Sequence, residues 1–391
     1  MRALRIDTEG QVRLTDSAPE PMVAPGDALV QVRRVLLTHL DAVAAGLVEA
    51  PAYSGTLGHL FVGVVKRAEE DPARRGAATA SNGRGGLVGK RVVASPSIAC
   101  AQCDLCRAGL SMHCRHRRVI GVHGHEGCCA SLVSVPLANL LVVPDSVPDE
   151  RAVFAHPLAC TLHAAHMLHS ANKAYVTVLG DGLEALLAAQ AMARVNKSVR
   201  LLSTRPDRAR LCERWGVRHR PVHEAGLRRD QDAVVDCTGS PGGLATALQM
   251  VRPRGVVLVQ SALGLMPVPA GKPRPVVGHG GAGASKAGAD EGRPSNGAGD
   301  PWVGGAGPNP DLALAAGNEV QILGCREGPL PDALALLCES GSGAVSGGGI
   351  DIAGLCPASG TRCRLEQAPS ALLALRDPAA LPHLIEIDPS R

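Results

Sequence analysis

Four cysteines fall within fifteen consecutive positions of the chain, in the stretch CAQCDLCRAGLSMHC. They are Cys100, Cys103, Cys106 and Cys114, separated by two, two and seven residues. Thiolates bind zinc tetrahedrally, and a two-residue spacer lets neighbouring sulfurs reach one ion from a tight turn. Because four cysteines fill all four positions and leave none for water, the stretch predicts a structural zinc ion and not a catalytic one.

Two alternatives for these cysteines are a pair of disulfide bonds and a zinc-ribbon DNA-binding module. The N-terminus lacks the apolar run of a signal peptide, and no uninterrupted apolar stretch reaches membrane-spanning length. We therefore expect a cytoplasmic protein in a reducing compartment, where clustered cysteines are more often metal ligands than disulfides. A zinc ribbon usually has two CxxC pairs separated by a longer stretch, which is not the spacing here.

A glycine-rich turn, VLGDGLEA, follows a strand-like run and opens a helix-like one. It reads Gly180-x-Gly182-x-x-Ala185. The two glycines permit a tight turn and the close approach of a pyrophosphate, and the small third residue lets the helix pack on the strand. The helix N-terminus adds partial positive charge. The motif predicts a dinucleotide site, and the alternative is a turn with a structural role alone.

The next strand after this turn ends with Ser203, Thr204 and Arg205, about twenty residues further on. A site for NAD prefers Asp or Glu at this place, to accept a hydrogen bond from the ribose 2′-hydroxyl. A small hydroxyl beside Arg205, with Arg208 nearby, suits a 2′-phosphate instead. The sequence therefore favours NADP over NAD, unless Arg205 is only a solvated residue at a helix start.

Two kinds of element must position these motifs. The first 150 residues are rich in short Val-containing runs, such as those at 26–37 and 60–68, which predict β-strands. After about residue 151, strands and helices alternate, with strands predicted at 174–180, 198–204, 233–240, 255–262 and 318–324. Such alternation predicts a parallel sheet with crossover helices. Residues 269–309 are dominated by Gly, Ala, Pro and Ser, and this composition predicts a disordered insert.

These motifs together resemble the medium-chain dehydrogenase/reductase superfamily, in its zinc-containing, alcohol-dehydrogenase-like branch. The segments GTLGHLFVGVVKR and VVDCTGSPGGLATAL continue the resemblance. It implies an α/β fold: a Rossmann-type doubly wound parallel sheet plus a discontinuous GroES-like β-domain. Residues 1–155 would form the GroES-like domain with a cysteine lobe at about 97–118, residues 156–325 the Rossmann domain, and 326–391 the return to the first domain.

The resemblance also implies a catalytic zinc site, and here the sequence departs from the family. The family's ligands are a Cys from a CGxD-like segment, the His of a GHE segment and further Cys or Glu residues. His59 stands at the His, but Thr38 (or Leu37, if counted from Gly46) replaces the Cys, and His156 replaces a Glu. Either His39, His59 and His156 form a substitute site, with Cys160 in reserve, or the catalytic metal is lost.

The function implied by the resemblance is hydride transfer between NADP(H) and a small alcohol, aldehyde or ketone. His59 would lie at the reaction centre, with Thr38 or His39 as a proton-relay or ligand partner. The alternative is a zinc-independent or catalytically silent nucleotide-binding relative that keeps only the structural zinc. Enzymes of this family are commonly dimers or tetramers, so the resemblance implies a homodimer or homotetramer. The 2% of aromatic residues and the net charge of +4 argue against a nucleic-acid partner, and no membrane partner is expected.

Overall fold

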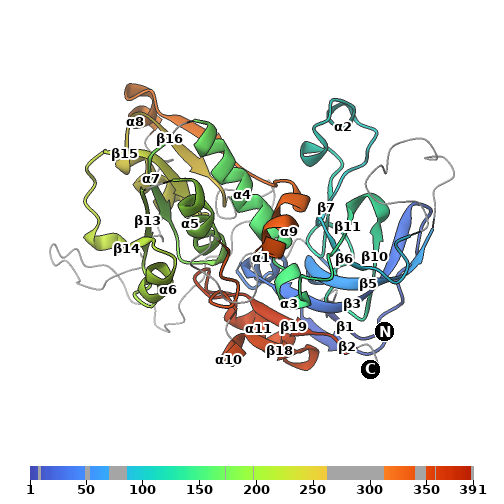
Figure 1. Ribbon diagram of the computed structural model, residues 1–391. Helices are drawn as coiled ribbons and strands as arrows, with labels where there is room; N and C mark the ends of the chain where they lie inside the picture. The colour runs from blue at the N-terminus through green and yellow to red at the C-terminus, as the bar shows by residue number, and fades with distance from the viewer. Residues whose placement is uncertain are drawn as a thin grey trace, which may run out of the picture.

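The computed structural model describes residues 1–7, 10–48, 53–69, 86–171, 173–196, 198–261, 312–339, 349–356 and 358–388. The segment 269–309, which we predicted to be disordered, lies outside these residues. The described chain forms a Rossmann-type domain and a β-rich domain, which lie at the left and right of Figure 1. The predicted fold class is confirmed.

The Rossmann-type domain is built on a parallel sheet with the strand order β14-β13-β12-β15-β16-β17. Its strands are β12 (Tyr175–Leu179), β13 (Ser198–Ser203), β14 (Arg218–Pro221), β15 (Gln231–Asp236), β16 (Val251–Val259) and β17 (Gln321–Gly324). The order reverses direction at β12, which lies between β13 and β15. In doubly wound sheets a ligand binds at the carboxyl ends of the strands beside this switch point.

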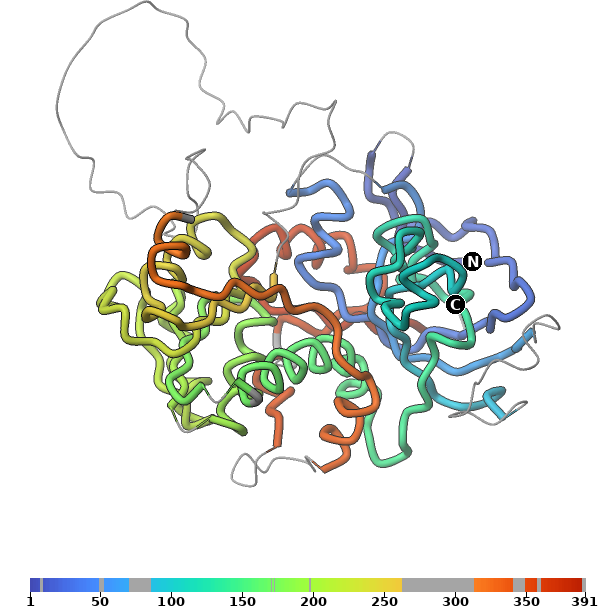
Figure 2. The backbone as a smooth tube through the Cα atoms, turned by 90° about the horizontal axis from the view of Figure 1, so that it is seen from above, coloured from blue at the N-terminus to red at the C-terminus, as the bar shows by residue number. Residues whose placement is uncertain are grey.

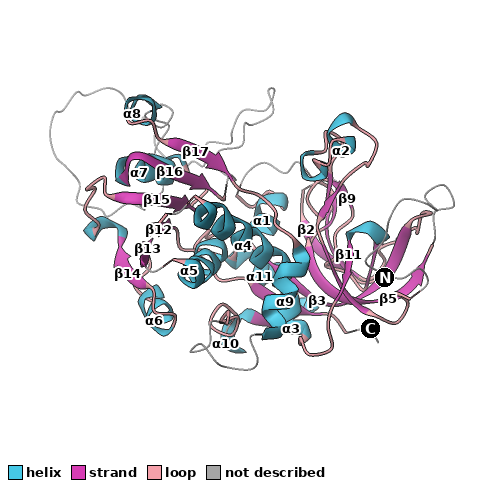
Figure 3. Cartoon of the chain, turned by 45° about the horizontal axis from the view of Figure 1, so that its top comes forward, coloured by secondary structure: helices cyan, strands magenta, loops and turns pink. Residues whose placement is uncertain are grey.

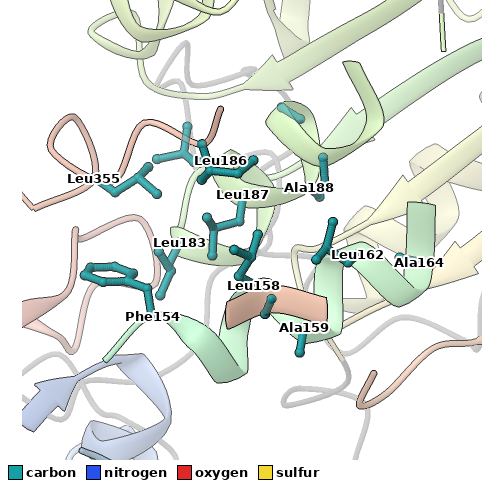
Figure 4. Packing of buried hydrophobic residues seen from close by; sticks show 14 of the residues in the cluster. Phe154, Leu158, Ala159, Leu162, Ala164, Leu183, Leu186, Leu187, Ala188 and Leu355 are labelled. Carbon is teal, nitrogen blue, oxygen red and sulfur yellow. The ribbon is translucent and has the colours of Figure 1, made fainter. Parts of the chain in front are cut away.

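Helices cover both faces of this sheet, as Figure 3 shows. They are α4 (Ala155–Ser170), α5 (Leu183–Val195), α6 (Arg208–Arg214), α7 (Pro241–Met250), α8 (Leu312–Gly317) and α9 (Leu330–Glu339). Leu158 of α4 and Leu183 and Leu186 of α5 pack together in the largest buried cluster, which also contains Phe154 (Figure 4). The apolar, Ala-rich sequence of α5 lets it lie flat on β12 and β13, so the glycine turn before α5 is held firmly.

The β-rich domain is organised around one long strand, β3 (Asp27–Leu37). It pairs with β5 (Leu60–Ala68), β10 (Leu132–Pro136) and β19 (His383–Glu386), all antiparallel. The remaining elements are β1 (Ala3–Ile6), β2 (Val12–Thr15), β4 (Gly55–Thr56), β6 (Arg91–Ala94), β11 (Leu140–Val142), β18 (Arg362–Arg364), α1 (His39–Ala44), α3 (Asp149–Ala152), α10 (Ala358–Thr361) and α11 (Ala368–Ala374). Its core is a separate cluster of Val, Leu and Ala side chains.

The C-terminal part of the chain returns to the β-rich domain. In Figure 2 the red segment that carries β19 lies beside the blue strands of the N-terminal part. On its way, the turn at residues 377–380 touches the Rossmann-type domain: Arg208 donates a hydrogen bond to the carbonyl oxygen of Ala379 over 2.7 Å. The return therefore connects the two domains at the glycine turn.

The cysteine lobe projects from the β-rich domain near α2 in Figure 1. It contains β7 (Ser97–Ile98), α2 (Asp104–Arg107), β8 (Arg118–Ile120) and β9 (Gly124–His125). Apart from Ile98, Cys114 and Ile120, few of its residues are buried. Elements this short and this exposed cannot be stabilised by an apolar core alone, so the lobe needs another constraint.

Candidate functional site

The four cysteines of the lobe gather around one point. Their sulfurs all lie within 4.8 Å of one another, and no other group of three or more His, Cys, Asp or Glu ligands occurs among the described residues. The Sγ–Sγ distance is 3.5 Å from Cys103 to Cys106 and 4.0 Å from Cys100 to Cys106. Sulfurs that share a tetrahedral zinc ion at about 2.3 Å lie about 3.8 Å apart. All four are free thiols and form no disulfide, and their arrangement fits a tetrathiolate zinc site.

Backbone N–H groups point at these sulfurs. The N–H groups of Cys100 and Cys103 lie 3.2 Å from Cys114 Sγ and 3.4 Å from Cys100 Sγ, respectively. The N–H groups of Cys106 and Arg115 lower the pKa of Cys103 to about 6, whereas burial and the neighbouring thiols raise the pKa of Cys106 to about 12. The backbone N–H groups of Gln102 and Cys103 also lower the pKa of Cys100, whereas Cys106 needs a cation between the sulfurs to ionise.

The glycine turn has the geometry that the sequence predicts. Gly180 has φ 134°, which favours glycine, and a Cβ there would lie 3.1 Å from the Cβ of Ala185. Helix α5 begins at Leu183, and no described side chain caps its N-terminus. Its first N–H groups are thus suited to a phosphate. A Cβ on Gly182 would lie only 2.6 Å from the carbonyl oxygen of Pro378, so the C-terminal return also approaches this turn closely.

The end of β13 is linked to the same turn. Asp181, between the two glycines, accepts hydrogen bonds from the backbone N–H and the hydroxyl of Thr204 over 2.7 and 2.9 Å. Its Oδ1 also accepts the N–H of Arg205 over 3.1 Å. The Arg205 guanidinium points to the return, where its Nη2 lies 2.6 Å from Asp377 Oδ2. The structure therefore brings Thr204 and Arg205 to the glycine turn, as predicted, but with two carboxylates beside them.

His59 lies directly before β5 and is paired with a buried aspartate. Its Nδ1 is 2.8 Å from Asp41 Oδ1, and the two side chains are 6% and 0% exposed. A carboxylate accepts hydrogen bonds, so this contact suits the imidazole tautomer with Nδ1–H, which would leave the lone pair on Nε2. The pair is therefore able to bind a metal or accept a proton through Nε2.

Thr38 and His39 lie at the start of helix α1, close to Asp41 in the sequence, but they contact different partners. Thr38 is the N-cap: its hydroxyl accepts the N–H of Leu40 over 3.2 Å, and its own N–H donates to Asp41 Oδ2 over 2.7 Å. His39 Nδ1 lies 2.8 Å from the carbonyl oxygen of Leu375 in the C-terminal return. Thr38 thus fixes the carboxylate that holds His59, whereas His39 contacts the return.

His156 belongs to another network, at the start of α4. Its Nε2 lies 3.4 Å from Glu327 Oε2 and 4.0 Å from Cys160 Sγ. Ser95 and Ser97 donate hydrogen bonds to the same glutamate. Burial alone would raise the pKa of Glu327, but the hydrogen bond and charge of His156 lower it to about 2. Burial alone would lower the pKa of His156, but Cys160 and Glu327 raise it to about 10.

The histidines proposed as a substitute zinc site do not gather in the structure. Within the described parts of the chain, the four cysteines are the one group of three or more metal-type ligands, so His39, His59 and His156 form no such group. Each has its own partner: Leu375, Asp41 and Glu327. At the family's catalytic position, the described residues therefore hold no preformed group of three ligands.

The contact between Asp41 and His59 was not predicted from the sequence. The spacing Thr38-x-x-Asp41 fits a capping box at the start of α1, but no local pattern indicates the contact with His59, 18 positions further on. Glu327, Asp181 and Asp377 were also missed. Asp377 lies 172 positions from Arg205, and Glu327 lies 171 positions from its partner His156, so local patterns carry no signal for them.

Comparisons with known proteins place this geometry in a family. Residues 24–145 match the family model of the alcohol dehydrogenase GroES-like domain. An L-threonine 3-dehydrogenase of Sinorhizobium fredii is 30% identical over 262 residues, which cover 64% of this chain and 69% of the relative. The chain belongs to the zinc-containing, alcohol-dehydrogenase-like branch of the medium-chain dehydrogenase/reductase superfamily. Membership in this dehydrogenase branch makes the protein an oxidoreductase by family.

Two further comparisons agree with this membership. This chain is 27% identical over 271 residues to an L-threonine 3-dehydrogenase of Chelativorans sp. The match covers 64% of this chain and 73% of the relative. Its fold is similar to that of a protein described as a zinc-binding dehydrogenase from Sinorhizobium meliloti, in a structure bound to NADP. That similarity has a TM-score of 0.70 and 21% identity, and covers 98% of each chain. None of the described helices is long and apolar enough to cross a membrane.

Proposed function

We propose that this protein transfers a hydride between NADP(H) and a small alcohol, aldehyde or ketone, and that it carries a structural zinc ion but no catalytic one. The observation that carries the proposal is the buried pair of His59 and Asp41, 2.8 Å apart, in a dehydrogenase-family chain that also has the glycine turn. The catalytically silent relative is the second candidate, because Thr38 replaces a zinc ligand.

The dinucleotide would be held by the residues of the glycine turn. Gly180, Gly182 and Ala185 would form the turn that the pyrophosphate approaches, at the uncapped N-terminus of α5. Thr204 and Arg205 at the end of β13 would face the adenosine ribose, and Arg205 suits a 2′-phosphate. The NADP bound by the Sinorhizobium meliloti protein of similar fold supports this choice. When bound, the nicotinamide supplies the hydride or accepts it.

His59 would handle the proton that accompanies the hydride. Oxidation of an alcohol releases the hydroxyl proton, and reduction of a carbonyl takes one up. With Nδ1–H donated to Asp41, the Nε2 of His59 accepts the proton in one direction and returns it in the other. Asp41 stabilises the imidazolium that forms in between. Thr38 would be a positioning residue, since its N–H fixes Asp41 Oδ2.

The single zinc ion would stay in the cysteine lobe. Cys100, Cys103, Cys106 and Cys114 would bind it as four thiolates, which leaves no position open for substrate. Two other histidines were candidates for a proton relay or a second zinc site. In this proposal His39 keeps its contact with Leu375, and His156 keeps its contact with Glu327. A homodimer or homotetramer remains part of the proposal, on the family's example alone.

Turnover of a panel of small alcohols, aldehydes and ketones, followed at the nicotinamide absorbance, tests the proposal. We expect activity with NADP(H), and a loss of about 100-fold or more in kcat for His59→Gln with the Kd for NADPH unchanged. His123→Gln, a histidine of the loop at 121–123, is the matched control and should behave as wild type. Tight NADPH binding without turnover of any compound would favour the silent relative.

A further inference from the structure

We propose that Asp377 competes internally for the place of the cofactor's 2′-phosphate, and thereby sets the preference between NADP(H) and NAD(H). This inference rests on the proposed function, because it assumes that a dinucleotide binds at the glycine turn. Arg205 is the residue that suits a 2′-phosphate, and its Nη2 already lies 2.6 Å from the carboxylate of Asp377. A phosphate that binds Arg205 must therefore displace this carboxylate or lie beside it.

Asp377 is held in place independently of Arg205. Its Oδ1 accepts the N–H of Ala379 over 2.8 Å, and its carbonyl oxygen accepts the N–H of Ala380 over 3.0 Å. These bonds close a tight turn at residues 377–380 and leave Oδ2 for the guanidinium. The backbone of its own turn thus holds the Asp377 carboxylate in the orientation that faces Arg205.

The turn at 377–380 is also attached to the Rossmann-type domain. Arg208, which is only 5% exposed, donates to the carbonyl oxygens of Ala379 over 2.7 Å and of Asp181 over 3.2 Å. The Pro378 carbonyl oxygen lies 2.6 Å from the place of a Cβ on Gly182. Arg208, the second arginine near the ribose site, is therefore engaged in holding the turn, and Arg205 is left to meet the 2′-phosphate.

Two carboxylates already lie beside Arg205, and a 2′-phosphate would add a third anion there. The Asp181 carboxylate accepts hydrogen bonds from the N–H and the hydroxyl of Thr204 and from the N–H of Arg205. These donors at the end of β13 are therefore already engaged. An incoming 2′-phosphate meets the carboxylates of Asp181 and Asp377 and has to share Arg205 with the latter. A ribose 2′-hydroxyl carries no charge and needs no such exchange. Removal of the Asp377 charge should therefore strengthen NADPH binding and leave NADH binding nearly unchanged.

The Kd values of NADPH and NADH, measured by nicotinamide fluorescence for wild type and Asp377→Asn, test the inference. Asn keeps the acceptor for the Ala379 N–H, so the turn should persist. We expect NADPH to bind about 10-fold more tightly to Asp377→Asn, with NADH within about twofold of wild type. The matched control is Asp332→Asn, which removes the same charge from an exposed position of α9 and should change neither Kd.

A second pair of variants separates the local contact from net charge. In an Arg205→Ala background, Asp377→Asn should no longer strengthen NADPH binding. The guanidinium for which Asp377 and the 2′-phosphate compete is then absent. An equal gain in both backgrounds would overturn the inference. So would an unchanged NADPH Kd in Asp377→Asn, while the proposed function would stand. If neither wild type nor any variant bound either nucleotide, the proposed function and this inference would both fail.

Discussion

At the scale of single residues, the chemistry depends on how Asp41 holds His59. The carboxylate is fully buried and has two fixed partners, His59 Nδ1 through Oδ1 and the N–H of Thr38 through Oδ2. A buried charge is tolerated only when such bonds satisfy it. The same bonds choose the imidazole tautomer that leaves Nε2 available.

Asp41→Asn should therefore lower kcat by about 100-fold. An amide can donate a hydrogen bond to Nδ1, which moves the imidazole proton to Nε2 and removes the acceptor. The KM for NADPH should not change, because Asp41 is a positioning residue in the β-rich domain and does not touch the glycine turn. Thr38→Ser, which keeps the capping hydroxyl, serves as the control. Equal losses in kcat for both variants would indicate damage to α1 instead.

At the scale of elements, the cysteine lobe and the C-terminal return behave differently. The lobe has few buried side chains, so its shape depends on the ion that its thiolates bind. The return is a covalent part of the β-rich domain through β19 and is attached to the Rossmann-type domain through Arg208. Loss of zinc should thus affect the lobe locally, whereas changes in the return should affect the cofactor site.

Removal of zinc by a strong chelator should open the lobe before the rest of the protein unfolds. The physical reason is that few side chains of the lobe are buried, so without the ion little holds its sulfurs together, while the two large apolar clusters do not involve the metal. Limited proteolysis should then cut first within residues 99–118, and protection should return on adding zinc. Simultaneous loss of protection along the whole chain would contradict this expectation.

The sequence predicts an element well where the pattern is local and apolar. The strand and helix around the glycine turn, Tyr175–Leu179 and Leu183–Val195, agree with prediction because their spacing and composition are unambiguous. The edge strand β14, Arg218–Pro221, was missed because it is short and polar, and its neighbour β13 alone places it in the sheet. The four cysteines were found by spacing, but the partners of Arg205 and His156 come from distant segments, which only the fold brings close.

At the scale of the whole molecule, the network of Glu327 and His156 links the two domains. Glu327 follows β17 of the Rossmann-type sheet. The two serines that donate to it are Ser95, directly after β6 of the β-rich domain, and Ser97, the first residue of β7 in the cysteine lobe. Its side chain is 7% exposed. Removing one partner of such a buried ion pair leaves the other charge without compensation.

Glu327→Gln should lower the free energy of unfolding by about 3 kcal/mol near pH 6. The pKa of Glu327 is lowered to about 2, so its stabilisation is present above its ordinary pKa and is lost as pH falls toward 2. The pKa of His156 is raised to about 10, so its stabilisation is present below its ordinary pKa and is lost as pH rises toward 10. Urea unfolding should show a smaller difference between variant and wild type at pH 10 than at pH 6. A constant difference would argue against the ion pair.

The zinc content of the purified, active full-length chain tests the central claim most directly, since it separates one structural ion from a pair of ions. Our account predicts about one zinc ion per chain by elemental analysis, and about none in Cys103→Ser. Two zinc ions per active chain, with one of them retained in Cys103→Ser and lost in His59→Gln, would contradict it.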